Sequence, residues 1–170
     1  MTFNYCPLCA SKLSRHRIDD NERLACDSSS CRFVHWNNPI PVVAALVRIA
    51  DEYILARNAT WPAGLFSVLT GFLEEGESPE TAVAREVDEE LGLEVHEIQF
   101  IGHFSFRERN QVIIAFACDA NGSLKTSDEI SETRSVPSHE LAEYDFGPLR
   151  LTQEIVARWL TMGSIKNPAS

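Results

Sequence analysis

Three glutamates stand close together near the middle of the sequence and could bind a metal ion. Glu86, Glu89 and Glu90 are spaced i, i+3 and i+4, so on a helix all three would project from one face. Carboxylates this close repel one another unless a cation lies among them, and hard oxygen ligands suit Mg²⁺ or Mn²⁺. The alternative is an ordinary solvated acidic helix face. The spacing alone leaves both interpretations open.

The residues around these glutamates predict the helix that would hold them. Ser78 is a suitable N-cap, Pro79 fits the first helical position, and Gly92 suits the left-handed residue that ends a helix. The glutamates would then lie in the C-terminal half, where the helix dipole disfavours negative charge, so helix stability alone does not explain them. A buried stripe at four-residue spacing comprises Val83, Val87 and Leu91.

Four of the five cysteines are grouped in two pairs near the N-terminus. Two residues separate Cys6 from Cys9, and four separate Cys26 from Cys31. We expect no signal peptide, because the first residues are neither basic nor apolar. The pairs therefore predict a structural Cys₄ zinc site, with free thiols or two disulfides as the alternatives. Cys118 lies in an apolar run and is expected to be a buried small hydrophobe.

Composition and charge narrow the possible partners. The chain has 170 residues, of which 44% are hydrophobic, and a net charge of −10. Residues 1–41 carry five Lys/Arg and four Asp/Glu, a net of +1, so the remainder carries −11. Such a surface repels phosphate backbones, which argues against general nucleic-acid binding. The longest apolar run, residues 42–47, is too short to cross a membrane, so we expect a cytoplasmic protein.

The prolines and asparagines of residues 36–41 predict a boundary between two domains, residues 1–38 and 39–170. The first would be a small zinc ribbon that needs its metal to fold, with a hairpin between the cysteine pairs. The second should be a layered α/β domain with a mixed sheet and helices on both faces. Its expected strands are residues 42–50, 53–57, 66–70, 94–106 and 112–118, with helices from 79, from 137 and over 152–160.

The stretch from residue 71 to residue 93 resembles the sequence signature of the Nudix hydrolases at every fixed position. This resemblance implies the Nudix fold, an α/β/α sandwich with a mixed sheet, and metal-dependent hydrolysis of a nucleoside diphosphate linked to another moiety. It assigns Mg²⁺ or Mn²⁺ to Glu86, Glu89 and Glu90. The matched positions are Gly71, Glu77, Arg85, Glu86, Val87, Glu89, Glu90, Gly92 and Leu93.

The resemblance also suggests roles for residues near the glutamates. Arg85 is expected to pair with Glu77 and hold the loop against the helix, with direct catalysis as an alternative. Gly71 would let the backbone approach the substrate phosphates closely. The general base would be Glu89 or Glu90, or a carboxylate of a later loop. The candidates in that loop are Glu129 and Glu132.

The chain has a cysteine module ahead of this motif, and in this combination it resembles the NADH and FAD pyrophosphatase branches of the family. Residues 103–109, however, lack the Ser-Gln-Pro-Trp motif of NADH pyrophosphatases. In its place Phe104 and Phe106 could stack on a base, while Arg107 and Arg109 could bind phosphate or ribose. The alternative is a strand with one apolar face. Trp61 and Phe72 are weaker stacking candidates.

We therefore expect a pyrophosphatase whose substrate is NAD(H), ADP-ribose or FAD, with a homodimer as one candidate assembly. One alternative is a catalytically silent nucleotide sensor with a ribbon that binds a partner, although intact glutamates argue against it. Another is removal of an NAD cap from RNA, which the acidic surface disfavours. The sequence does not choose among the nucleotides.

Overall fold

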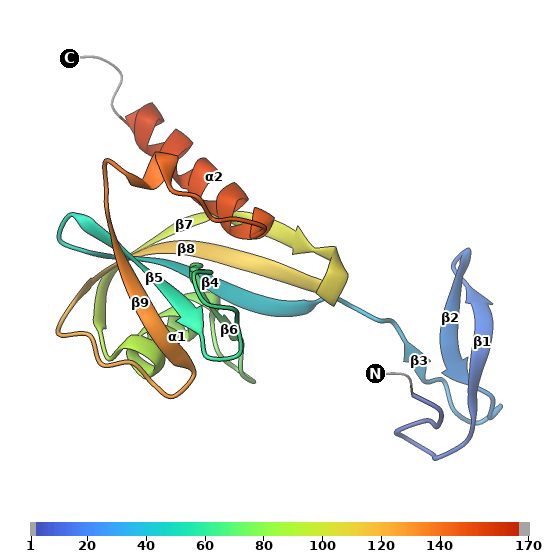
Figure 1. Ribbon diagram of the computed structural model, residues 1–170. Helices are drawn as coiled ribbons and strands as arrows, with labels where there is room; N and C mark the ends of the chain where they lie inside the picture. Colours follow the sequence, from blue (N-terminus) through green and yellow to red (C-terminus); the bar gives the residue numbers. More distant parts are fainter. Residues whose placement is uncertain (1–2, 167–170) are drawn as a thin grey trace. The chain divides into compact units, whose positions relative to one another are not determined.

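The computed structural model describes residues 3–166 of the chain, with side chains through residue 163. The chain forms two compact units, Met1–Asn38 and Pro39–Ser170, and each has its own sheet (Figure 1). None of the helices in the described part is long and apolar enough to span a membrane.

The N-terminal unit is a three-stranded antiparallel sheet of β1 (Leu13–Ile18), β2 (Asn21–Cys26) and β3 (Val34–His35). Ile18 pairs with Asn21, so β1 and β2 are joined by the two-residue loop Asp19-Asp20. Both aspartates have positive φ, 49° and 62°, which matches the tight turns whose twist suits a hairpin. The hairpin expected between the cysteine pairs is confirmed.

The second unit is built on a six-stranded mixed sheet. Its strand order is β7-β8-β4-β5-β9, and β6 pairs with β4. β4 and β8 run parallel, and the other pairs are antiparallel. The strands are β4 (Ile40–Ile49), β5 (Glu52–Asn58), β6 (Leu69–Phe72), β7 (Glu94–Phe106), β8 (Gln111–Asn121) and β9 (Ile130–Pro137).

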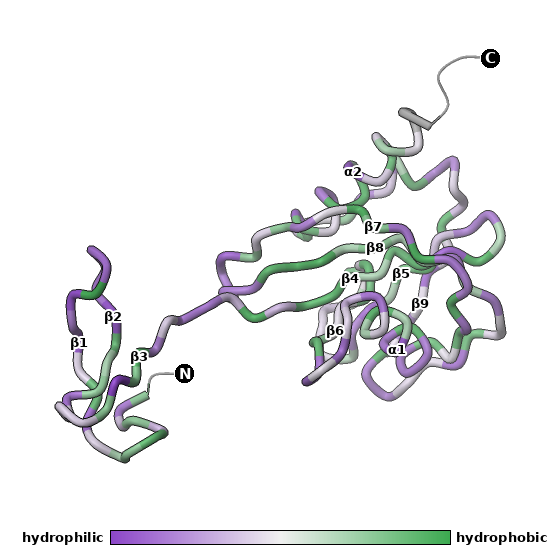
Figure 2. The backbone as a smooth tube through the Cα atoms, turned by 180° about the vertical axis from the view of Figure 1, so that it is seen from behind, coloured by the Kyte–Doolittle hydropathy of each residue, from purple (hydrophilic) through white to green (hydrophobic). Residues whose placement is uncertain are grey.

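Helices cover both faces of this sheet. Side chains alternate along a strand, so β4 sends Val42, Ala44 and Leu46 into a core with α2 (Arg150–Lys166). It sends Val43, Ala45 and Val47 into a core with α1 (Pro79–Leu91). Figure 1 shows α1 and α2 on opposite sides of the sheet, and Figure 2 shows the apolar course of β4 and β8 between them. The predicted α/β/α arrangement is confirmed.

Some boundaries differ from those expected. The short strand predicted at residues 66–70 is β6, at Leu69–Phe72, because Ser67 makes only an isolated bridge to Ala56. The helix expected from residue 137 is a 3₁₀ turn, η2 (Leu141–Glu143), and another, η1 (Arg107–Arg109), follows β7. The shift of β6 matters for the site, since pairing with Val43 now fixes Gly71 in the sheet.

Candidate active site

Helix α1 has the caps that its sequence predicts. Ser78 is extended, with φ −80° and ψ 155°, and its side-chain oxygen accepts a hydrogen bond from the Thr81 backbone N at 3.2 Å. Gly92 adopts the left-handed conformation, with φ 64°, and its N–H donates to the Asp88 carbonyl at 2.8 Å. Burial of the predicted stripe against the sheet fixes the rotation of the helix and thus the face that carries the glutamates.

Arg85 ties the preceding loop to this helix. Its Nε and Nη2 donate to the two carboxylate oxygens of Glu77 at 2.9 and 3.0 Å, and Nη2 also donates to the Phe72 carbonyl at 3.0 Å. Only 23% of the Arg85 side chain and 10% of the Glu77 side chain are exposed. These hydrogen bonds hold the pKa of Glu77 below its usual value. The expected Arg85–Glu77 ion pair is therefore present, in a bidentate geometry.

The same guanidinium also reaches two of the three candidate metal ligands. Nη1 of Arg85 lies 2.9 Å from Glu86 Oε1 and 2.9 Å from Glu89 Oε2. The Glu86 side chain is 14% exposed, whereas that of Glu89 is 58% exposed. Burial, followed by repulsion from Glu86, Glu129 and Glu89, raises the pKa of Glu90 to about 7. Burial likewise raises the pKa of Glu86. The carboxylates of the cluster are thus both desolvated and mutually repulsive. A bound cation would offset the repulsion.

Of the two later carboxylates, the structure brings Glu129 to this cluster. The loop before it docks on the C-terminal end of α1, where the N–H groups of Lys125 and Ser127 donate to the carbonyls of Leu91 and Glu90 at 2.8 and 3.1 Å. The charge of Glu129 contributes to the raised pKa values of Glu86 and Glu90. Glu132 instead lies on β9 and pairs with Arg57 at 3.4 Å.

Gly71 leaves room for a carboxylate. A Cβ placed on Gly71 would lie 1.8 Å from the carboxyl carbon of Glu86 and 2.2 Å from its Oε1. Pairing of Gly71 with Val43 in the sheet prevents the backbone from moving away. The absent side chain of Gly71 therefore defines where the Glu86 carboxylate sits.

We expect Gly71→Ala to lower kcat/KM about 100-fold, because the new methyl group must push the Glu86 carboxylate from its place. Steady-state kinetics with a range of Mg²⁺ concentrations checks this, and the Mg²⁺ requirement should rise as well. Gly163→Ala is the matched control, since a Cβ at Gly163 has no neighbour within 4 Å. Unchanged kinetics in Gly71→Ala would contradict this role for the glycine.

A cavity of about 740 Å³ opens beside Gly71. Phe106 and Arg109 line it, as do Trp61 and Phe72. Phe104 and Phe106 both pack against the core under α2, but only Phe106 also lines the cavity. Arg107 is exposed in η1 and is not among the lining residues. The remaining wall includes residues 148–152 and 154 around the start of α2, which no sequence pattern links to a binding site. That segment is far from the glutamates in the sequence, so no short-range pattern relates the two.

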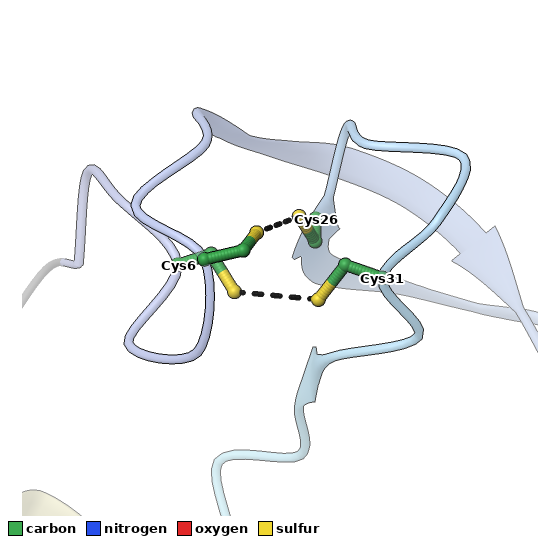
Figure 3. A group of neighbouring side chains, drawn as sticks. Cys6, Cys26 and Cys31 are labelled. Carbon is green, nitrogen blue, oxygen red and sulfur yellow. Dashed lines mark hydrogen bonds between the residues drawn. The ribbon is translucent and has the colours of Figure 1, made fainter.

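The four clustered cysteines in the N-terminal unit converge as expected. Cys6 Sγ lies 3.7 Å from Cys31 Sγ, and Cys9 Sγ lies 3.5 Å from Cys26 Sγ, too far apart for disulfide bonds. Figure 3 shows the sulfurs of Cys6, Cys26 and Cys31 turned toward one another. Metal–sulfur bonds of about 2.3 Å in a tetrahedron imply sulfur separations near 3.8 Å. The cluster can therefore hold a metal ion.

The cysteine cluster is also the tightest group of potential ligands. Within the described residues, only these four cysteines bring three or more His, Cys, Asp or Glu ligand atoms within 4.8 Å of one another. The carboxylates of Glu86, Glu89 and Glu90 are spread more widely, and two of them turn to Arg85.

Comparison with known proteins agrees with these features. The family model of the NUDIX domain matches residues 38–160 of the sequence. The chain is 33% identical over 125 residues to the NAD-capped RNA hydrolase NudC of Vibrio atlanticus, which covers 73% of this chain and 45% of that protein. It is 43% identical over 77 residues to NudC of Mycobacterium tuberculosis, covering 45% of this chain and 25% of that protein. The chain thus spans less than half the length of these relatives.

Two solved structures share the fold. A NUDIX hydrolase from Nitrosomonas europaea has a TM-score of 0.77 at 22% identity, covering 98% of this chain and 96% of that one. An ADP compounds hydrolase has a TM-score of 0.64 at 16% identity, covering 94% of this chain and 98% of that one. With the capped glutamate helix and the domain match over residues 38–160, these findings show that the chain belongs to the Nudix family of hydrolases.

Proposed function

We propose that this chain hydrolyses the diphosphate linkage of a nucleoside diphosphate joined to a second moiety. The observation that carries the proposal is the carboxylate cluster of α1. Its Glu86 carboxylate lies against Gly71, and Gly71 lines a cavity large enough for a nucleotide. NAD(H), ADP-ribose and FAD are the candidate substrates. The names of the relatives, NAD-capped RNA hydrolase and ADP compounds hydrolase, favour the first two.

Glu86, Glu89 and Glu90 would bind Mg²⁺ or Mn²⁺. Carboxylate oxygens are the ligands these ions prefer, and the raised pKa values of Glu86 and Glu90 reflect a repulsion that a cation would offset. When bound, the cation neutralises charge on the diphosphate and polarises a phosphoryl oxygen toward attack.

The remaining steps fall to residues of the chain. Arg85 orients Glu86 and Glu89 through its Nη1. We assign proton transfer to Glu129, which is exposed and lies close enough to act on the charges of Glu86 and Glu90. A water oxygen forms a bond to one phosphorus, its proton passes to the Glu129 carboxylate, and the bridging P–O bond breaks. The products are two phosphate monoesters.

The cavity would hold the nucleotide. Trp61, Phe72 and Phe106 offer aromatic rings for stacking on a base, and the guanidinium of Arg109 lies 5.9 Å from the centre of the Phe106 ring. Arg109 would place positive charge beside the substrate in an otherwise acidic domain. Phe106 and Arg109 are thus the substrate-binding residues that we propose from residues 103–109.

The N-terminal cluster would bind Zn²⁺. Four thiolates at tetrahedral spacing are the donors of a structural zinc site, because zinc in such sites takes four sulfur or nitrogen ligands and leaves no open position. Zinc would therefore stabilise the ribbon and take no part in hydrolysis.

A specific feature of the ribbon favours NAD-capped RNA as a second candidate substrate. The guanidinium of Arg23 stacks over Trp36 at 4.7 Å, and that tryptophan is partly exposed. Such an aromatic and basic pair suits a single-stranded nucleic acid. If RNA is the substrate, we expect Trp36→Ala to slow removal of an NAD cap from RNA and to leave hydrolysis of free NAD⁺ unchanged. If Trp36→Ala removes the NAD cap from RNA as fast as wild type does, this candidate is contradicted.

A hydrolysis panel with Mg²⁺ and Mn²⁺ tests the proposal. It should include NADH, NAD⁺, ADP-ribose, FAD, dinucleoside polyphosphates and nucleoside triphosphates, with products separated by chromatography. We expect cleavage of at least one of the first four to two monophosphates. Binding without cleavage of any would favour the nucleotide-sensor alternative.

A further inference from the structure

Two hydroxyl side chains are buried together in the wall of the cavity. Within residues 3–163, Ser67 and Thr152 are the buried residues with polar side chains, and they are 5% and 3% exposed. Ser67 precedes β6, and Thr152 lies in the first turn of α2. Their side-chain oxygens are 2.7 Å apart, so they share a hydrogen bond. Two segments that are 85 residues apart thus place their hydroxyls at one point.

Several apolar residues lie around this pair in the cavity wall. Ser67 and Thr152 both line the cavity beside Gly71. Neighbouring parts of the wall come from Val42 and Ile113, which are buried in the core under α2. Other apolar members of the lining are Leu65, Leu149 and Leu151. The hydroxyl pair is therefore a buried polar spot beside these apolar residues, in a lining whose other polar members include Arg109, Arg150 and Glu154. A few polar groups among apolar ones are the pattern by which binding sites orient a ligand.

The pair retains hydrogen-bonding capacity after its internal bond. Two hydroxyls supply two donors and four lone pairs, and their mutual bond uses one donor and one lone pair. The backbone of Ser67 is already satisfied, since its N–H and carbonyl bond to Ala56 at 3.0 and 2.9 Å. One O–H donor and adjacent acceptor positions therefore remain in a buried wall, where leaving polar groups unpaired is costly.

We infer that Ser67 and Thr152 form a subsite that reads the edge of the substrate's heterocyclic ring. The pair complements a planar ring carrying a hydrogen-bond acceptor beside a donor. In the proposed substrates this chemistry occurs in two places, the adenine edge with its amino group and the carboxamide of nicotinamide. The inference rests on the proposed function and deepens it, because it assigns base selectivity to residues outside the glutamate cluster.

The test uses NAD⁺ and two analogues that each lack one of these groups. One has purine in place of adenine, and the other has pyridine in place of nicotinamide. We expect wild-type kcat/KM to fall on the order of 10-fold or more for one analogue, mainly through KM, since the lost bond lies away from the reacting phosphorus. The analogue that is rejected identifies the ring in the cavity.

Substitutions of the pair should remove this selectivity. Thr152→Val is expected to lower kcat/KM for NAD⁺ to the value of the rejected analogue. Thr152→Ser keeps the hydroxyl and should keep the selectivity. Ser67→Ala provides a second variant in case Thr152→Val folds poorly. Thr161→Val is the control, because Thr161 lies on the same helix and its hydroxyl bonds to the Ala157 carbonyl outside the cavity.

The outcomes separate selectivity from a structural tie. A pair that only fastens α2 to the sheet would give equal losses on all three nucleotides together with a lower Tm, and this result would overturn the inference. So would a wild-type enzyme that cleaves all three nucleotides equally well. If wild type cleaves none of them but hydrolyses ADP-ribose or FAD, NAD⁺ is not the substrate, and if it cleaves none of these nucleotides, the proposed function fails. Dissociation constants from calorimetry with the same nucleotides and variants would then decide whether the subsite reads the ring.

Discussion

Replacing Glu89 with glutamine is expected to lower kcat/KM on the order of 1,000-fold while leaving the fold intact. Glutamine keeps the size of the side chain and an oxygen that can accept from Arg85 Nη1, as Glu89 does at 2.9 Å. The side chain is 58% exposed, so the free energy of unfolding should change by less than about 1 kcal/mol. What is lost is a negative charge for the cation. Steady-state kinetics and thermal unfolding on the same preparation measure both effects.

Asp88→Asn provides the matched control for this variant. Asp88 is also exposed on α1 and loses the same charge one residue away, but it is not one of the glutamates assigned to the cation. We expect its kinetics to stay within about twofold of wild type, because a lone exposed charge is largely screened. Unchanged Mg²⁺-dependent hydrolysis in Glu89→Gln would remove Glu89 from the set of metal ligands.

Loss of one cysteine of the cluster should have the largest effect on stability. Structural zinc contributes about 10–16 kcal/mol in small modules that fold only with the metal. Cys26→Ser is therefore expected to abolish zinc binding and to unfold the three-stranded sheet, because Cys26 ends β2 and its thiol lies 3.5 Å from that of Cys9. The zinc content measured by elemental analysis should fall from one zinc per chain to none. Hydrogen exchange should lose protection in β1 and β2.

The second unit supplies the control for this experiment. Amides of β4 and β8 should keep their protection in Cys26→Ser, because they belong to the separate sheet of residues 39–170. Cys118→Ala removes the buried thiol of β8 and should leave zinc at one per chain. A wild-type protein that contains no zinc when purified without chelator would refute the assignment.

The helix and the cysteine cluster were predictable because short-range chemistry determines them. Ser78, Pro79 and Gly92 specify where α1 begins and ends, and the structure places it at Pro79–Leu91. The glutamates need only the helical repeat to share a face. The cysteine pairs likewise need only a hairpin to meet, and the loop Asp19-Asp20 supplies it.

The substrate cavity was not predictable in the same way, because tertiary contacts create it. Phe104 and Phe106 are two residues apart on one strand, so the sequence predicts that both point to the same face of the sheet. Both pack against the core under α2, and only the structure shows that Phe106 also lines the cavity whereas Phe104 does not. Glu129 and Glu132 were equivalent candidates until the docking of Lys125 and Ser127 on α1 distinguished them.

The pair of Ser67 and Thr152 shows the same limit more strongly. Each is an unremarkable residue in its own segment, and the hydrogen bond between them spans 85 positions of the chain. No local spacing signals it. The three candidate metal ligands thus lie in one continuous stretch, whereas Glu129 and the residues that would choose the substrate come from segments brought together by the fold.

The proposed hydrolysis of a diphosphate depends on the glutamates of α1 and on a divalent cation. The most direct test follows ADP-ribose by ³¹P NMR in the presence of Mg²⁺, after addition of a chelator, and after Mg²⁺ is restored. The proposal predicts that the diphosphate resonances give way to two phosphate monoester resonances, that the chelator stops the conversion, and that Mg²⁺ restores it. Conversion that continues at full rate in excess chelator, or diphosphate that persists in every arm while NAD⁺, NADH and FAD also stay intact, would contradict it.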